Sequence, residues 1–243
     1  MALPAFIPVS GEDSRPLTEP ATKRRHEIST MPVRIHLPSA TALALALSAC
    51  GPTTGAPASG EELYDACENC HGSDGAGNPD IEAPQIAGLP QWYIEAQLHK
   101  FRSGARGAHP DDAPGMRMRP LSMSMPNDES VTAVARYVSR LPRQGNHEPK
   151  VAGGSATRGS GYYAPCVTCH GASGQGNPAL NAPPLAGSPD WYLTAQLRKF
   201  IDGVRGGDAA ADPTGAQMRA MAVTLPNDQA IKDVVAHIMT FEP

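Results

Sequence analysis

Cys67-Glu68-Asn69-Cys70-His71 and Cys166-Val167-Thr168-Cys169-His170 are two copies of one five-residue motif. Each copy has two thiols separated by two residues, and an imidazole follows the second thiol directly. The two motifs contain four of the five cysteines in this chain of 243 residues. We interpret them as the two centres around which the chain folds.

The spacing Cys-x-x-Cys-His is the attachment sequence for haem c, in which two thioethers hold one porphyrin edge and the histidine binds the iron. We therefore expect two covalently bound haem c groups, with His71 and His170 as axial ligands. The thioether cysteines are Cys67, Cys70, Cys166 and Cys169. The alternatives are a zinc site or a redox dithiol. A zinc site made of the four cysteines would leave both histidines unexplained, and no βαβ pattern surrounds either motif.

Both motifs lie inside an internal repeat. Residues 64–107 align without a gap on residues 163–206, which predicts two copies of one structural unit. We expect two tandem domains, 60–141 and 159–243, joined by a linker at 142–158. A domain of this size buries a limited core, so a covalently fixed porphyrin would also be structural.

Each half shows helical patterns and no convincing strand. Ser59 and Glu62 have the spacing of a capping box ahead of a first helix that runs into the motif. A second helix stops near Gly104, and Asn127 and Asn227 are the expected caps of a last helix with apolar residues on one face. We expect an all-α fold with about three helices around each haem.

The second axial ligand decides the chemistry of a haem iron. Methionine raises the potential for electron transfer, whereas an open position permits gas binding or catalysis. Several methionines follow each motif, but only Met118 and Met218 coincide when the halves are aligned at Pro126 and Pro226. We predict that these two are the ligands. Met116 is the rival in the first half, and filling a gap in the core is the alternative role for any methionine.

A ligating imidazole usually donates its other N–H to a fixed acceptor. Pro84 and Pro183 stand 13 residues after their histidines, and we expect their carbonyls to accept from His71 and His170; plain loop prolines are the alternative. Three further residues in each half are candidates for contacts with the haem propionates: Trp92, Tyr93 and Arg106, and their counterparts Trp191, Tyr192 and Arg205. Helix packing, or a solvated charge for the arginines, is an equal alternative.

The segment before the repeat has the features of an export signal. Residues 40–47 are an apolar run too short to span a bilayer, and Leu47-Ser48-Ala49-Cys50 resembles the lipobox of bacterial lipoproteins. We expect residues 1–49 to be a signal segment, Cys50 to carry the lipid, and residues 50–59 to be a flexible spacer. The alternative is an ordinary signal peptide with a coincidental cysteine.

Residues 1–30 fit a signal peptide poorly, because they contain several prolines and a Lys23-Arg24-Arg25 cluster. We expect that translation starts at Met31, which would leave a signal of ordinary length. A disordered extension is the alternative.

The formal charge of the chain is −4 at pH 7. This mildly acidic balance gives no case for nucleic-acid binding. After the apolar run at residues 40–47, no stretch approaches the length of a transmembrane helix.

Residues 60–241 resemble class I cytochromes c of the tandem di-haem kind, the cytochrome c4 type. The shared features are the paired motifs, Pro-x-(Leu/Ile)-Ala-Gly, an aromatic-x-x-x-Gln-Leu helix and a methionine shortly before the last helix. The resemblance implies two all-helical domains with His/Met haems that pass electrons to terminal oxidases. The lipobox and an Asn-Asp pair at the cap of the last helix depart from that family.

We therefore expect a lipid-anchored electron carrier, and not an enzyme, on the periplasmic face of a bacterial membrane. The expected partners are redox proteins such as a quinol-oxidising complex and a terminal oxidase. One alternative is a di-haem subunit of a dehydrogenase or oxidase complex. The other is a di-haem enzyme, such as a peroxidase or a thiosulfate-oxidising cytochrome, which needs an iron with a displaceable ligand.

Overall fold

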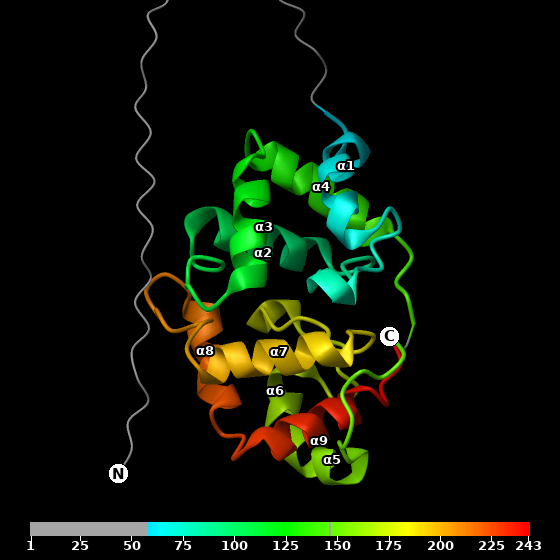
Figure 1. Cartoon of the computed structure of the whole chain (residues 1–243), viewed down its shortest axis with the longest axis vertical. Coiled ribbons are helices and arrows are strands. Elements are labelled where there is room, and N and C mark those ends of the chain that lie inside the picture. Colours follow the sequence, from blue (N-terminus) through cyan, green and yellow to red (C-terminus); the bar gives the residue numbers. More distant parts are fainter. Residues whose placement is uncertain (1–57, 146) are drawn as a thin grey trace, which may run out of the picture. The chain divides into compact units, whose positions relative to one another are not determined.

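The computed structural model describes residues 58–145 and 147–243 (Figure 1). Over these residues the chain forms α-helices, short 3-10 helices and two isolated β-bridges, with no strand. The expected all-α class is confirmed. The predicted signal segment, the start at Met31 and the lipid-bearing Cys50 lie outside the described residues. Within them, no helix has the length and apolar character needed to cross a membrane.

The first domain is built from four α-helices and one 3-10 helix in the described part of the chain. They are α1 (Gly60–His71), η1 (Pro79–Ile81), α2 (Gln91–Ser103), α3 (Ala113–Met123) and α4 (Asp128–Arg140). The predicted caps are present: Ser59 and Glu62 form both bonds of a capping box at α1, and Asn127 accepts from Ser130 N at α4.

The second domain repeats this order with one difference. Its elements are α5 (Ala156–Tyr163), η2 (Ala164–Cys166), α6 (Val167–His170), η3 (Pro178–Leu180), α7 (Asp190–Ile201), α8 (Pro213–Ala222) and α9 (Asp228–Ile238). Here the helix that leads into the motif is divided, whereas α1 is continuous. Pro165 lies at the division; it lacks an N–H, and its ring disfavours a regular α-helix at that point.

The expected count of about three helices per domain is too low: within the described residues the first domain has four α-helices, and the second has five because its first helix is divided. The segments before the last helices form α3 and α8, which carry Met118 and Met218. Prolines and glycines in these segments conceal the helical pattern. Both helices nevertheless have a strong start signal, since Asp112 and Asp212 accept hydrogen bonds from the backbone N–H three residues on.

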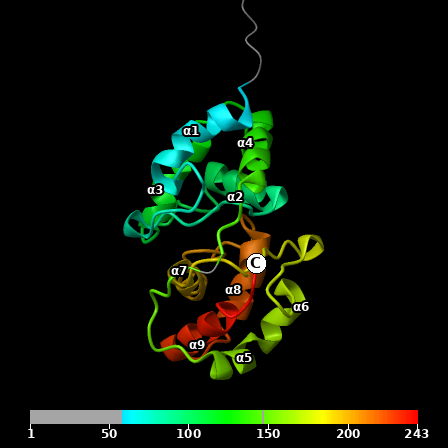
Figure 2. The ribbon, with the colours of Figure 1, turned by 90° about the vertical axis from the view of Figure 1, so that its right-hand side faces the viewer.

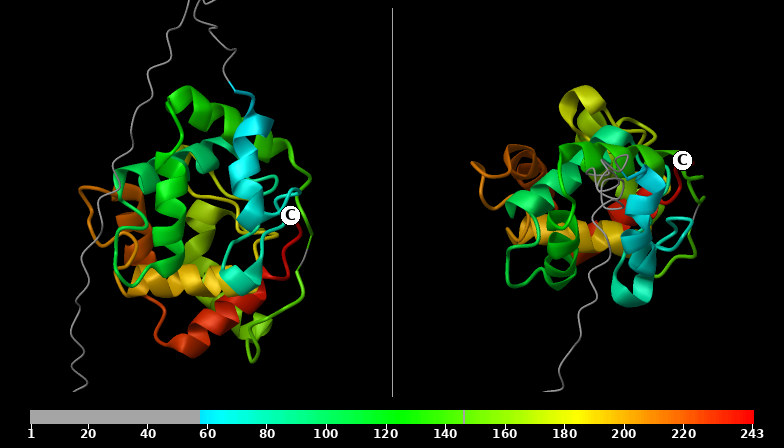
Figure 3. Two further views of the ribbon diagram at one scale, coloured as in Figure 1. Left: turned by 45° about the horizontal axis from the view of Figure 1, so that its top comes forward. Right: turned by 90° about the horizontal axis from the view of Figure 1, so that it is seen from above.

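The core of each domain lies between its first and last helices. α1 packs against α4 (Figure 3) and α5 against α9 (Figure 2). Glycine permits this close approach: a Cβ on Gly60 would lie 2.2 Å from the carbonyl oxygen of Ala133, and one on Gly159 would lie 1.9 Å from that of Asp233. The buried residues include Tyr64, Val131, Val134, Ala135 and Val138, and in the second domain Tyr163, Ile231, Val234, Val235 and Ile238.

The connection between the domains is held at several points. α5 begins at Ala156, inside the range that we assigned to the linker. The buried carboxylate of Asp190 accepts from the backbone N–H groups of Lys150 and Val151 at 2.7 and 2.6 Å. The guanidinium of Arg143 donates to the carbonyl oxygen of Ala186. The linker is therefore packed against the second domain.

α2 and α7 lie where the two domains meet (Figure 1), and side chains of the two domains contact each other there. Lys100 Nζ lies 2.6 Å from Asp212 Oδ1, and Lys199 Nζ lies 2.6 Å from Asp112 Oδ1. Both carboxylates are almost fully buried. The contacts repeat because the sequence repeats: each domain gives the lysine of its second helix to the helix-capping aspartate of the other.

Candidate haem sites

The two motif histidines have the same surroundings. His71 ends α1 and His170 ends α6, and they are only 7% and 6% exposed. Nδ1 of each lies 2.8 Å from the predicted proline carbonyl, that of Pro84 or Pro183. Because a carbonyl only accepts, Nδ1 donates and Nε2 has the free lone pair. Burial lowers the pKa of both histidines, which favours the neutral imidazole that binds metals.

A tight loop after each motif brings the proline back to the histidine. In the first domain Gly77 N donates to His71 O at 2.8 Å, and Asn78 pairs with Ala83 in a short antiparallel bridge. Gly77 has φ 85°, and a Cβ there would lie 2.5 Å from the carbonyl carbon of Pro84. The second domain repeats this loop with Gly176 and Pro183.

A tyrosine fixes the end of each motif helix. The hydroxyl of the buried Tyr64 donates to Gly72 O at 2.7 Å, and the hydroxyl of Tyr163 donates to Gly171 O at 2.7 Å. Each glycine directly follows its histidine. The bond therefore anchors the backbone beside the imidazole, which helps to keep the ring in one orientation.

The motif cysteines do not have the properties of a redox dithiol. All four are free and partly buried. Burial, with a smaller contribution from Cys70, raises the pKa of Cys67 to about 11, and burial also raises the pKa of Cys166. Reactive thiols need a lowered pKa. In the described part of the chain, moreover, no three His, Cys, Asp or Glu side chains converge to hold a metal ion such as zinc.

Met118 and Met218 occupy equivalent positions in the second turns of α3 and α8. Both are half-buried, and Met118 packs against the core of the first domain. Met116, the rival in the first half, is 49% exposed. Met118 and Met218 stay our prediction for the second axial ligands.

The pattern of the cytochrome c family matches residues 57–142 and 156–242. The chain belongs to the cytochrome c family. Its two Cys-x-x-Cys-His motifs hold two covalent haem c groups, so it is a di-haem, cytochrome c4-like class I cytochrome c.

Several curated cytochromes are similar to it. It is 35% identical over 173 residues to a thiosulfate dehydrogenase electron acceptor of Thiomonas intermedia. This alignment covers 64% of this chain and 75% of that protein. Identity to the protein of the same name in Stutzerimonas stutzeri is 34%, over 77% of this chain and 89% of the relative. A cytochrome c4 of Pseudomonas aeruginosa is 28% identical, over 80% of this chain and 91% of that protein.

Solved structures show the same likeness. The thiosulfate dehydrogenase TsdBA of Marichromatium purpuratum matches with a TM-score of 0.60 and 30% identity, over 76% of this chain and 40% of that chain. This cytochrome thus spans less than half the length of TsdBA. Reduced cytochrome c4 of Pseudomonas stutzeri matches with a TM-score of 0.60 and 24% identity, over 75% of this chain and 96% of that chain. This match supports the assignment of the fold.

Four arginines, two buried and two half-buried, fit the carboxylates of haem propionates. Within the described residues, the Nε atoms of these side chains are buried and have no hydrogen-bond partner. They are Arg106, Arg119, Arg205 and Arg219. A guanidinium only donates, and a buried donor normally has an acceptor. Arg106 and Arg205 were candidates from sequence, whereas Arg119 and Arg219 were not. The signal for them is their place directly after the predicted methionine ligands in both halves.

The charge at the domain contact also favours an added anion. Arg106 and Arg205 each donate to Gln97 and Gln196, and they stack on Phe101 and Phe200, respectively. The two aspartates of the contact balance only the two lysines, so the buried arginines are left without a carboxylate. Burial lowers the pKa of Arg205 to about 10. A propionate beside Arg205 would offset this cost. Burial acts in the same direction on Arg106, but Tyr192, Tyr93 and Asp112 raise the pKa of that side chain.

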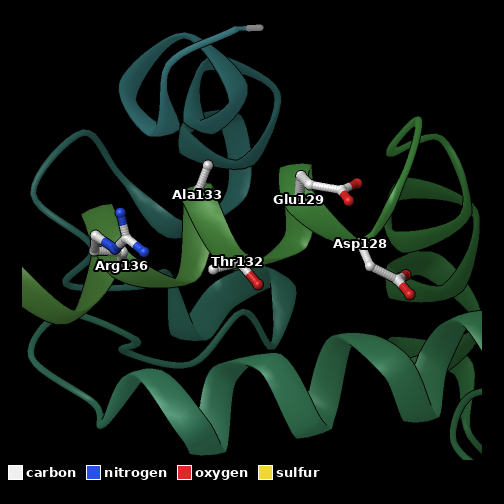
Figure 4. Close-up of a pocket in the computed structure, with 5 residues that line it drawn as sticks. All are labelled: Asp128, Glu129, Thr132, Ala133 and Arg136. Atoms are coloured by element: carbon white, nitrogen blue, oxygen red, sulfur yellow. The ribbon is translucent and has the colours of Figure 1, made fainter.

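The remaining candidates have structural contacts. Trp92 packs edge-on against Tyr93, and Trp191 does the same against Tyr192. The pocket in Figure 4 lies along α4, lined by Asp128, Glu129, Thr132, Ala133 and Arg136. It contains none of the haem-binding residues, and we assign it no function.

Proposed function

We propose that this cytochrome is a membrane-tethered periplasmic electron carrier, which accepts electrons from a thiosulfate dehydrogenase and passes them towards a terminal oxidase. The donor is supported by the two relatives of 34–35% identity, both of which are named thiosulfate dehydrogenase electron acceptors. Tethering is supported by the lipobox sequence that ends at Cys50. It would confine the carrier to the membrane surface.

The observation that favours a carrier is that each domain has a buried motif histidine and, at equivalent positions, a half-buried methionine. Bound haem c supplies an iron that changes its charge by one electron without making or breaking a bond to a substrate. The protein's part is to hold His71 and His170 through their bonds to the proline carbonyls. If Met118 and Met218 also bind the irons, neither iron has a free position for a substrate, which suits electron transfer.

The test is reduction of the oxidised cytochrome by thiosulfate with a purified thiosulfate dehydrogenase, followed in the haem absorption bands. We expect reduction of both haems with the enzyme, and none with thiosulfate alone. Reduction by thiosulfate alone, or carbon monoxide binding to the reduced protein, would support the enzyme alternative. No reduction in the presence of an active dehydrogenase would contradict the proposed donor.

A second candidate is a fixed subunit of an oxidase complex. It is favoured by the likeness to the cbb3-type cytochrome c oxidase subunit FixP of Bradyrhizobium diazoefficiens, at 26% identity over 69% of this chain and 59% of that protein. Co-purification from membranes distinguishes the two functions. A stoichiometric oxidase partner would support the subunit, and isolation of the cytochrome alone would support the mobile carrier.

A further inference from the structure

We propose that the first domain carries a docking surface for a redox partner with a basic rim, and that the second domain lacks it. The inference rests on the proposed function, because it names where such a carrier meets one of its partners. It is argued from an exposed apolar patch, from the acidic segment that carries the haem-attaching motif and η1, and from the contrast with the second domain.

Four large apolar side chains on η1 and α3 are exposed, and together we call them the apolar patch: Ile81, Met116, Leu121 and Met123. Met116 and Met123 are seven residues apart and share one face of α3, whereas Leu121 lies on another part of its exposed surface. Arg117 joins the two elements, since its Nη2 donates to Ile81 O at 2.9 Å. α3 also carries Met118, the predicted iron ligand, so the patch lies on elements that flank the haem site. Exposed apolar side chains with a polar rim are typical of protein contact sites.

The chain segment that carries the haem-attaching motif and η1 is acidic. Residues 59–88 include the haem-attaching motif and η1, and they contain acidic side chains but no Lys or Arg. Every acidic side chain in this segment is exposed: Glu61, Glu62, Asp65, Glu68, Asp74, Asp80 and Glu82. Among them only Glu82 is near an arginine, at 3.5 Å from the exposed Arg117. The segment therefore has a large surplus of negative charge.

The second domain provides an internal comparison. Its matching segment, residues 158–187, contains no acid and one base, Arg158. Val167 stands in the place of Glu68, Ala179 in that of Asp80, and Asn181 in that of Glu82. The backbone is the same, since Glu82 and Asn181 have φ 56° and 53°. Most of the apolar patch is also repeated, because Leu180, Met221 and Val223 are exposed at the positions of Ile81, Leu121 and Met123. The two haem sites thus share their geometry and differ in charge.

This contrast determines the partner that fits. Carboxylates around an apolar centre attract a partner whose cofactor edge is bordered by Lys and Arg, and they repel an acidic partner. Such charges act over about 10 Å at 0.1 M salt and raise the association rate. The second domain has no comparable charge on this surface. We assign the first domain to the basic partner and leave the second for a partner that docks without such steering.

The experiment measures electron transfer from hexaammineruthenium(II), a small cation, to the oxidised full-length protein over a range of ionic strength. The test variant is E68Q/D80N/E82Q. The control variant E129Q/D202N/E242Q removes the same number of exposed acids elsewhere. At low salt we expect the test variant to react at least about 3-fold more slowly than the control, with a flatter salt dependence. Haem spectra show whether each variant is folded.

A transplant tests the same idea in the opposite direction. V167E/A179D/N181E gives the second domain the acids of the first, and we expect faster reduction by the cation at low salt. Polylysine tests a macromolecular partner: it should bind the wild type more tightly than E68Q/D80N/E82Q. Equal rates for the test and control variants, or equal polylysine binding, would overturn the inference. Because no thiosulfate dehydrogenase is used, these results are independent of the proposed donor.

Discussion

At the scale of single residues, the chemistry of this cytochrome depends on side chains that the repeat places twice. His71 and His170 have the same burial and the same bond to a proline carbonyl. Met118 and Met218 share a register on two helices. A ligand role for both methionines would make the two irons chemically similar and closed to substrates.

Replacing either Met118 or Met218 by leucine tests the ligand assignment. Each variant should lose about half of the near-infrared sulfur-to-iron band, because one of the two irons loses its sulfur. The potential of that haem should fall by on the order of 100 mV, since axial ligands tune haem potentials widely. M116L is the matched control and should keep both the band and the potentials. Loss of the band in M116L would show that the assignment in the first domain is wrong.

At the scale of elements, each domain depends on a close crossing of its first and last helices. Gly60 and Gly159 lie at these crossings, where a side chain would meet backbone atoms of the facing helix. The second domain adds an ion pair between an exposed arginine and a buried aspartate at the same place: Asp233 accepts from Arg158 Nε at 2.7 Å and from Ser155 N at 2.8 Å. In the first domain Ala133 replaces Asp233 and no such pair forms.

The glycine at the crossing can be tested within one helix. G159A should destabilise the second domain by about 1–3 kcal/mol, because overpacking forces α5 away from α9. G161A lies on the same helix with nothing within 4 Å of its Cβ, and it should stabilise by about 0.4–1 kcal/mol. Chemical denaturation measures both. A neutral G159A would mean that the crossing adapts at no cost.

The Asp233 ion pair predicts a dependence of stability on pH. The hydrogen bond with Arg158 holds the pKa of Asp233 at about 2, below its ordinary value of 3.8. A lowered folded pKa stabilises the protein above the unfolded value, and the contribution is lost as the pH falls from about 4 to about 2. Urea unfolding should therefore show that D233N is less stable than the wild type at pH 7. It should also show that D233N loses less stability than the wild type between about pH 4 and about pH 2. Parallel pH profiles would refute this role.

At the scale of the whole molecule, the two domains are joined by reciprocal contacts. One lysine–aspartate pair connects α2 to the start of α8, and the other connects α7 to the start of α3. The linker is bonded to the second domain through Asp190. These contacts place the two predicted haem sites in one unit. The docking surface differs from them, because it makes the two domains unequal towards partners.

The cross-domain pairs predict coupled unfolding. K100M leaves the buried carboxylate of Asp212 without its partner, which should cost about 3 kcal/mol. The calorimetric transition should then broaden or separate into two. K100M/D212N should recover much of the loss, because asparagine removes the charge and still caps α8. Equal stability of the single and double variants would contradict an electrostatic contact between the domains.

Much of this protein was predictable from its sequence, because covalent haem attachment requires one short motif and because the repeat supplies an internal alignment. The all-α class, the two haems, the capped helices and the proline acceptors followed from local patterns, which depend on neighbouring residues. The helices α3 and α8 were missed because prolines and glycines conceal their periodicity. Only the tertiary structure brought Lys100 to Asp212, buried the Nε atoms of Arg119 and Arg219, and joined Arg117 to Ile81. Such contacts join residues that are distant in the chain. Their energy depends on burial, which cannot be inferred from a local sequence pattern.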